Sequence, residues 1–166
     1  GVRRADRRPA ALRCPKDAEL SNDLGYAQAH DTSIEERYEP VPLLKDKVIV
    51  LSGVGPGLGR ALGEEAAKLG ADLVLASRTA SRLEKMAAVV ESHGRRAVVV
   101  PTDITDEASR AALVERSLEA FGRVDCLLNN AFAIPPMDPI TQISSEALAK
   151  ANETNVFAPL RLSALF

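Results

Sequence analysis

The segment 47–59 reads KVIVLSGVGPGLG, an apolar run that passes directly into four alternating glycines. An unbroken run of Val, Ile and Leu favours a strand that is buried on both faces of a parallel sheet. A glycine-rich turn between such a strand and a helix lets the backbone approach a pyrophosphate, and the helix N-terminus adds free N–H donors. The segment therefore predicts the first strand, turn and helix of an α/β fold with a phosphate-binding turn.

The same alternation of strand and helix continues along the chain. Apolar runs rich in Val, Leu and Ile occur at 47–52, 72–77, 96–101 and 124–129. Between them apolar residues recur at helical spacing, and Ser81 and Glu84 have the spacing of a capping box at a helix start. A glycine suited to end each helix in a left-handed conformation follows at Gly70, Gly94 and Gly122. These βα units predict a doubly wound, Rossmann-type parallel sheet with right-handed crossovers, truncated after the fourth strand and the following helix.

Glycines at alternate positions fit several nucleotide-binding templates, and the spacing separates them. Gly-x-Gly-x-x-Gly fails because Leu58 or Arg60 stands where the third glycine is needed. A P-loop fails because no Gly-Lys-Ser/Thr follows. The spacing Gly-x-x-x-Gly-x-Gly fits, with Gly53, Gly57 and Gly59. The alternative is a glycine turn that only connects a strand to a helix.

The segment Ser52-Gly53-x-x-x-Gly57-Leu58-Gly59 resembles the Thr-Gly-x-x-x-Gly-x-Gly signature of classical short-chain dehydrogenases/reductases. Ser52 replaces the usual threonine and keeps its hydroxyl. The resemblance implies that these five residues bind the pyrophosphate of a nicotinamide dinucleotide. It extends over residues 43–166, which are similar to the N-terminal part of the family's Rossmann-type domain.

The second predicted strand ends at Ser77-Arg78, about 20 residues past the glycine turn, where the ribose 2′-position is expected. An acidic residue there would hydrogen-bond the hydroxyls of NAD, whereas the donor fork of Arg78 suits a 2′-phosphate. The pattern resembles the NADP-preferring members of the family. We therefore expect NADP(H) as the cofactor, with NAD(H) less favoured; the alternative is that Arg78 is a solvated loop residue.

The third predicted strand leads into Thr102-Asp103-Ile104-Thr105. The family resemblance implies that Asp103 contacts the adenine and that the backbone of Ile104 lies beside it. From the residues alone, Asp103 or Thr105 is also suited to cap a helix.

The fourth predicted strand closes with residues 129–132, which resemble the family's Asn-Asn-Ala-Gly motif. By that resemblance, Asn130 and Ala131 border the ribose of the cofactor. Phe132 departs from the glycine of the motif, and we expect its ring to help shape a substrate pocket. The alternative is an asparagine pair in an ordinary turn.

A last helical stretch is predicted from about residue 144 to the end, with Asn155 on a mostly apolar face. Pro159 lies four residues further on and has no N–H, so we expect a kink and an unpaired main-chain carbonyl at Asn155. In the family, an asparagine at this place holds a water of the proton relay with that carbonyl. Asn155 is therefore the candidate catalytic residue; the alternative is a structural asparagine in a packed helix.

The remaining catalytic residues of the family are a serine and a Tyr-x-x-x-Lys pair. No such pattern occurs here, and Tyr26 and Tyr38 both precede the first strand. The resemblance thus implies an N-terminal fragment without turnover. The intact protein would transfer hydride between NADP(H) and a small carbonyl or alcohol substrate.

Three other functions remain open from the sequence. One is an NAD(P)-binding module without chemistry, such as a redox sensor, and another is a structural fragment without a ligand. A sugar-nucleotide epimerase is disfavoured by Pro56 in the glycine turn. A homo-oligomer of the intact protein is compatible with each of them.

The composition is that of an ordinary globular protein, with 46% hydrophobic and 27% charged residues and a net charge of −2. No apolar run approaches the ~20 residues of a membrane-spanning helix, so no membrane partner is expected. Cys14 and Cys126 are far apart, which argues against a disulfide framework and for a cytoplasmic location. No metal site is expected.

Residues 1–16 are predominantly basic and residues 17–39 predominantly acidic, and neither block has a helical or strand period. A basic arm suggests nucleic acid or a transit peptide, but this one lacks aromatic residues, an apolar core segment and an amphipathic stripe. We therefore expect no nucleic-acid partner, and we interpret residues 1–42 as a disordered leader.

Limited proteolysis tests this interpretation. Because residues 1–42 have no apolar period with which to join a core, cleavage should occur there first and leave a core that starts near Leu43. Strong hydrogen-exchange protection of the Tyr26 or Tyr38 amides would contradict it.

Overall fold

The computed structural model describes residues 42–134 and 137–166. The leader expected at residues 1–42 therefore lies, except for residue 42, outside the described residues. The elements follow one another as β1 (Val48–Ser52), α2 (Leu58–Lys68), β2 (Asp72–Ser77), α3 (Ala80–Ser92), β3 (Ala97–Pro101), α4 (Glu107–Phe121), β4 (Cys126–Asn129), η1 (Ile140–Gln142), α5 (Ser145–Asn152), η2 (Glu153–Phe157) and α6 (Ala158–Ser163). η1 is a 3₁₀ turn, and η2 is a π-helical segment.

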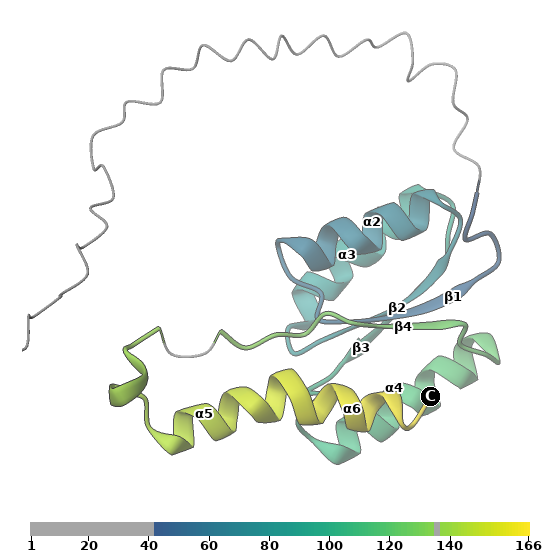
Figure 1. Ribbon diagram of the computed structural model, residues 1–166. Helices are drawn as coiled ribbons and strands as arrows, with labels where there is room; N and C mark the ends of the chain where they lie inside the picture. The colour runs from purple at the N-terminus through teal and green to yellow at the C-terminus, as the bar shows by residue number, and fades with distance from the viewer. Residues whose placement is uncertain (1–41, 135–136) are drawn as a thin grey trace, which may run out of the picture. The chain divides into compact units, whose positions relative to one another are not determined.

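Within the described residues, the four strands form one parallel sheet in the order β3-β2-β1-β4. Val50 in the central strand β1 stands opposite Val74 on one side and Leu127 on the other. Helices α2 and α3 cover one face of the sheet, while α4, α5 and α6 lie on the other (Figure 1). The predicted α/β, doubly wound fold is confirmed, and the reversal of strand order between β1 and β4 marks the place where such sheets bind ligands.

Each face of the sheet packs its own apolar core. Leu51, Leu73 and Leu75 point toward α2 and α3, where Leu83 and Val90 complete the layer. On the opposite face the core consists of strand, loop and helix residues from β1 through α6: Val50, Val74, Ala76, Val100, Ile104, Leu113, Ala158 and Leu162. The central strands are thus buried on both sides, as their unbroken apolar runs predicted.

The helix ends were predicted in part. Gly70, Gly94 and Gly122 have φ values of +98°, +71° and +72°, so all three adopt the left-handed conformation. The prediction of a capping box at Ser81 and Glu84 was wrong, because α3 already begins at Ala80 and its N-cap residue is Thr79, which has an extended backbone. Ser81 is therefore inside the first turn, where its side chain cannot cap the helix start.

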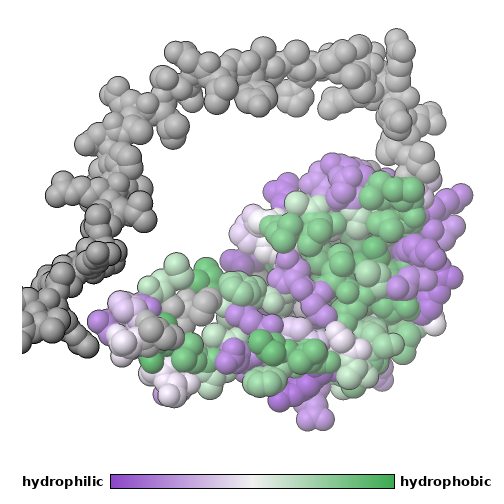
Figure 2. Space-filling view, viewed as in Figure 1, coloured by the Kyte–Doolittle hydropathy of each residue, from purple (hydrophilic) through white to green (hydrophobic). Residues whose placement is uncertain are grey.

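Strand β4 forms one edge of the sheet and is less buried than its neighbours. Cys126 and Asn129 are exposed, and Leu127 and Leu128 are half-buried. Figure 2 shows apolar surface between the helices of the two faces, where Figure 1 has this edge strand. An apolar edge of this kind carries unpaired backbone groups that can pair with another strand. Among the described helices, none has the length and apolar character needed to cross a bilayer.

Candidate cofactor-binding site

The carboxyl ends of the strands open into a cleft of about 1370 Å³. The glycine turn after β1 forms one wall, the segments that follow β2 and β3 form the next, and the segment after β4 with α5 lines the far side. Ten of the residues expected at the cofactor line this cleft: Gly53, Gly57, Leu58, Gly59, Ser77, Arg78, Asp103, Ile104, Asn130 and Ala131. Ser52 and Asn155 lie outside its lining.

The glycine turn packs against the end of β4 with no room for side chains. A Cβ on Gly53, which has a φ of +96°, would lie 2.3 Å from the backbone nitrogen of Ala131. A Cβ on Gly59 would lie 2.3 Å from the carbonyl oxygen of Gly53. The side chain of Asn130 holds this contact, because its Nδ2 donates to the same Gly53 carbonyl at 2.7 Å. Two glycines of the motif are therefore required by chain packing.

The other glycines of the turn leave space instead. A Cβ on Gly55 or Gly57 would meet nothing within 4 Å, and both residues line the cleft. Backbone that is free of side chains at a helix N-terminus is the arrangement that lets a phosphate approach N–H donors. The sequence motif treats position 55 as variable, yet Gly55 is as open as Gly57.

Two buried serine hydroxyls near the turn have no hydrogen-bond partner among the described residues. Ser52, at the end of β1, is fully buried and does not reach the cleft. Ser77, at the end of β2, lines the cleft. A buried polar group without a partner costs about 1–3 kcal/mol, so a ribose or phosphate oxygen beside Ser77 would remove that cost. This unpaired hydroxyl fits a nucleotide ligand.

Asp103 is held in a tight turn at the end of β3. Its Oδ1 accepts hydrogen bonds from the hydroxyl of Thr105 at 2.7 Å and from the backbone N–H of Thr105 at 2.9 Å. These two bonds, with a smaller effect from the positive charge of Arg78, lower the pKa of Asp103 below its ordinary value. An ionised carboxylate at this position can accept a hydrogen bond from an amino group such as that of adenine.

The alternative reading of Asp103 or Thr105 as a helix cap was wrong. The N-cap residue of α4 is Asp106, whose carboxylate accepts from the backbone N–H of Ser109 at 2.7 Å. Asp103 stands three residues earlier and bonds within its own turn.

Arg110 fixes the segment beside Asp103 and was missed from the sequence. It is 5% exposed, and its Nη1 donates to the carbonyl of Ile104 at 2.7 Å. Arg110 shares the buried side of α4 with Leu113 and Ser117, at spacings of three and four residues. An arginine and a serine form no apolar stripe with Leu113, so the hydrophobic pattern of this segment did not mark Arg110 as buried.

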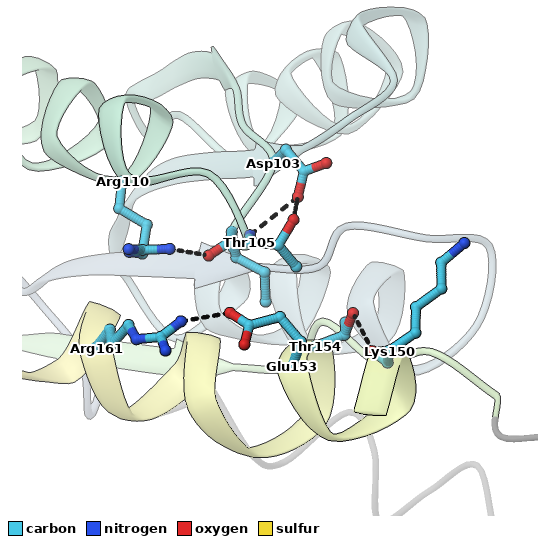
Figure 3. A network of polar contacts seen from close by, with 8 residues as sticks. Asp103, Thr105, Arg110, Lys150, Glu153, Thr154 and Arg161 are labelled. Carbon is cyan, nitrogen blue, oxygen red and sulfur yellow. Dashed lines mark hydrogen bonds and ion pairs between the residues drawn. The ribbon is translucent and has the colours of Figure 1, made fainter. Parts of the chain in front are cut away.

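Helix α5 and η2 supply the polar side of the cleft opposite Asp103. Lys150, Glu153 and Thr154 line the cleft, and sequence analysis had not selected them. In Figure 3, Glu153 is paired with Arg161, whereas the side chain of Lys150 extends away from that pair. The hydroxyl of Thr154 bonds back to the Lys150 carbonyl at 3.5 Å.

Two hydrogen bonds from Asn155 hold the loop that follows β4. Its Oδ1 accepts from the backbone N–H of Ala133 at 2.8 Å, and its Nδ2 donates to the carbonyl of Ala133 at 2.8 Å. Both the Oδ1 and the Nδ2 of the Asn155 side chain therefore have a partner. This fits the structural role that the sequence offered as the alternative to a catalytic one. The role of its main-chain carbonyl stays a prediction.

Pro159 interrupts the regular helix, as expected, and the interruption takes the form of a π-turn. The backbone N–H of Ala158 donates to the carbonyl of Glu153, five residues back, and Pro159 lies at the start of α6. The single kinked helix predicted from residue 144 is therefore three consecutive segments. A local π-turn is a common response where one hydrogen bond of the regular ladder is lost.

Apolar side chains lie at the end of the cleft beyond β4. Phe132 is 67% exposed and Ile134 is 79% exposed, and both line the cleft. Within residues 42–134 and 137–166, no three His, Cys, Asp or Glu side chains gather where they could hold a metal ion.

Known proteins that are similar to this chain indicate one family. A family model described as short chain dehydrogenase matches residues 47–166. The uncharacterized oxidoreductase YhdF of Bacillus subtilis is 31% identical over 161 residues, which cover 90% of this chain and 56% of that protein. An uncharacterized oxidoreductase of Mycobacterium tuberculosis is 38% identical over 113 residues, which cover 68% of this chain and 43% of that protein. The chain therefore spans about half the length of these curated relatives.

Solved structures share the fold over the same portion. NAD⁺-bound xylitol dehydrogenase is 26% identical with a TM-score of 0.70, over 74% of this chain and 47% of that one. A double mutant of a Serratia marcescens short-chain dehydrogenase/reductase is 25% identical with a TM-score of 0.69. The match covers 74% of this chain and 50% of that one.

The two kinds of glycine can be separated by alanine substitution. Gly59→Ala should lower the free energy of unfolding by about 1–3 kcal/mol or more, because its Cβ would overlap a backbone oxygen. Gly55→Ala, whose Cβ meets nothing, should change it by less than about 0.5 kcal/mol. Urea unfolding of both variants measures this, and equal losses would contradict the packing described for the turn.

Proposed function

The chain belongs to the short-chain dehydrogenase family, and we propose that the intact protein transfers hydride between NADP(H) and the carbon of a small carbonyl or alcohol substrate. The observation that carries this proposal is the convergence of an open glycine turn, Arg78 and Asp103 on one cleft. The nicotinamide, when bound, supplies the hydride chemistry, and the protein supplies binding and orientation.

The residues of the cleft fit the parts of a dinucleotide. The open backbone at Gly55 and Gly57 suits the pyrophosphate at the N-terminus of α2. The unpaired hydroxyl of Ser77 suits the adenosine ribose, and the ionised carboxylate of Asp103 suits the adenine amino group. Arg110 keeps the Asp103 segment in place through the Ile104 carbonyl.

The preference for NADP(H) rests on Arg78. It is exposed, lies directly after β2 and lines the cleft. No acidic residue stands at this position to accept hydrogen bonds from the two ribose hydroxyls of NAD, whereas a guanidinium matches the charge and geometry of a 2′-phosphate. The NAD⁺ in xylitol dehydrogenase belongs to that protein, which is 26% identical to this chain over 47% of its own length.

Cofactor titration of an arginine variant tests the preference. A guanidinium–phosphate pair contributes about 1.5–3 kcal/mol, which corresponds to roughly 10- to 150-fold in affinity. Arg78→Ala should weaken NADPH binding toward the lower end of that range, because Arg78 is exposed to solvent. NADH binding of the same variant is the control and should hardly change. Equal affinity of the unmutated protein for both cofactors would overturn the proposal.

The substrate and its chemistry belong to the other end of the cleft. Phe132 and Ile134 present apolar surface there, which supports a substrate with an apolar part. Asn155 holds the backbone of this loop through Ala133, and its carbonyl is our candidate for the water of a proton relay.

We expect the 166 residues alone to have no dehydrogenase turnover, although they retain part of the nucleotide site. No Tyr follows Tyr38, so a Tyr-x-x-x-Lys proton donor is missing from this sequence. Loss of a general acid costs about 10²–10⁴-fold in rate, and loss of positioning adds to that. The measurement is NADPH oxidation with a panel of ketones and aldehydes, for this chain and for a full-length version.

Each result of that assay has a distinct meaning. Turnover by the 166-residue chain within tenfold of the full-length protein would contradict the assignment of the missing residues. A full-length protein that binds nucleotide but oxidises no NADPH would favour the NAD(P)-binding module or redox sensor instead.

A further inference from the structure

The segment that follows β4 leaves two large apolar side chains open to solvent at the end of the cleft. Phe132 and Ile134 are both mostly exposed, and both line the cleft. In the motif that residues 129–132 resemble, glycine stands at position 132, so the ring is a departure from that motif. The function proposed above uses these side chains only as apolar surface and assigns them no class of substrate.

The backbone on both sides of Phe132 is fixed. On one side, residues 130–131 lie so close to Gly53 that a Cβ on that glycine would overlap their backbone. On the other side, the side chain of Asn155 bonds both the N–H and the carbonyl of Ala133 at 2.8 Å. A ring that is presented by an anchored backbone loses little conformational entropy when a ligand packs on it. Phe132 is thus prepared to bind an apolar group.

Hydrogen-bonding groups are scarce in this part of the cleft. Among residues 130–134 the only polar side chain is that of Asn130, and its Nδ2 already donates to the carbonyl of Gly53. The N–H and the carbonyl of Ala133 already bond to Asn155. A substrate hydroxyl that left water to lie against this segment would find few replacements for its hydrogen bonds, and an unpaired buried hydroxyl weakens binding. The segment therefore disfavours a polyhydroxylated substrate.

An aromatic ring matches the same surface. Aromatic pairs prefer offset-stacked or edge-to-face arrangements, and their attraction adds to that of the apolar area they bury. None of residues 130–134 is charged, so a charged group of the ligand would find no counter-ion in this segment. An uncharged aromatic group thus has more to gain from Phe132 than a sugar chain or a charged group has.

We infer that the substrate of the intact protein is a carbonyl or alcohol compound that carries an aromatic ring, and that Phe132 is the residue that selects it. The substrate ring packs on Phe132 and against Ile134 at the end of the cleft beyond β4. In the direction of reduction, the carbonyl carbon accepts the hydride of NADPH and the oxygen accepts a proton, which gives the alcohol and NADP⁺. The inference rests on the proposed function and deepens it by naming the substrate class.

Two ketones with the same carbon skeleton isolate the contribution of the aromatic ring. Acetophenone has a flat aromatic ring, whereas cyclohexyl methyl ketone has a puckered, saturated one. With NADP⁺ present, the 166-residue chain should bind acetophenone about 2- to 12-fold more tightly, because an aromatic pair adds to the burial of apolar area. D-fructose, a polyhydroxylated ketone, should bind more weakly than either. Saturation-transfer NMR of the ligand protons, followed as a titration, gives the dissociation constants.

Variants of Phe132 show whether its ring causes the preference. Phe132→Leu should reduce the difference between the two ketones to less than about 2-fold, and Phe132→Tyr should keep it. Phe166→Leu is the matched control, because Phe166 is also exposed but does not line the cleft. It should leave both dissociation constants unchanged. Thermal unfolding of each variant confirms that it is folded, as expected for substitutions of exposed side chains.

The full-length version allows a kinetic test with the same ketones. Phe132→Leu should lower the ratio of kcat/KM for acetophenone over cyclohexyl methyl ketone about 2- to 12-fold, and the change should lie mainly in KM, because the ring contributes to binding rather than to proton transfer. If neither ketone binds the 166-residue chain strongly enough to be measured, this ratio decides. A ratio that is the same in Phe132→Leu and in the unmutated protein then overturns the inference.

The outcomes separate this inference from the proposed function. Equal affinity of the unmutated protein for the two ketones, or equal losses in Phe132→Leu and Phe166→Leu, overturns the inference while NADPH binding leaves the proposed function intact. Binding of D-fructose as tight as that of acetophenone also overturns it. If sedimentation shows self-association that Phe132→Leu abolishes and neither ketone distinguishes the variants, the ring belongs to an interface between copies and the inference is wrong. Absence of nucleotide binding in every form of the protein overturns both.

Discussion

The contact between the glycine turn and the end of β4 is the constraint on which the rest of the structure depends. Gly53 approaches the backbone of residues 130–131 so closely that an added Cβ would overlap it, and Gly59 approaches the carbonyl of Gly53 just as closely. Asn130 then closes the contact by donating to the Gly53 carbonyl. Because this contact places β4 beside β1 and on the far side from β2, it creates the switch in strand order at which the cleft opens.

Much of the fold could be predicted because its signals are local. Buried parallel strands need unbroken apolar runs, and left-handed helix ends need glycines such as Gly70 and Gly122, so both leave a mark in short segments. The predictions that were wrong also concern short segments, namely the starts of two helices. Ser81 has the right spacing for a capping box, but α3 begins one residue before it, and Asp106 rather than Asp103 caps α4. Cap residues compete within two or three positions, and tertiary packing decides between them.

The lining of the cleft was predicted where the backbone forms it and missed where helices bring side chains together. Gly53, Gly57 and Gly59 act through the absence of a side chain, which a motif records. Lys150 and Glu153, in contrast, meet the cleft from α5 and η2, far from the turn in sequence. No spacing rule relates such residues, because their proximity depends on how the helices cross the sheet. Arg110 was missed for the same reason, because its burial and its bond to the Ile104 carbonyl depend on how α4 packs against the sheet.

The cleft has two ends of different character, and they come from different parts of the chain. The segments after β1, β2 and β3 carry the open glycines, Arg78 and Asp103, so the groups proposed for the phosphates and the base precede β4. The segment after β4 carries Phe132 and Ile134, whose apolar side chains are mostly exposed and which Asn155 holds in place only through the backbone of Ala133. The proposed nucleotide contacts therefore come from packed strand ends, whereas the proposed substrate contacts come from a loop and a helix with a π-turn. Because Phe132 belongs to the segment after β4, whereas the open glycines, Arg78 and Asp103 belong to the segments before it, we expect substitutions at Phe132 to alter substrate selection with little effect on cofactor affinity.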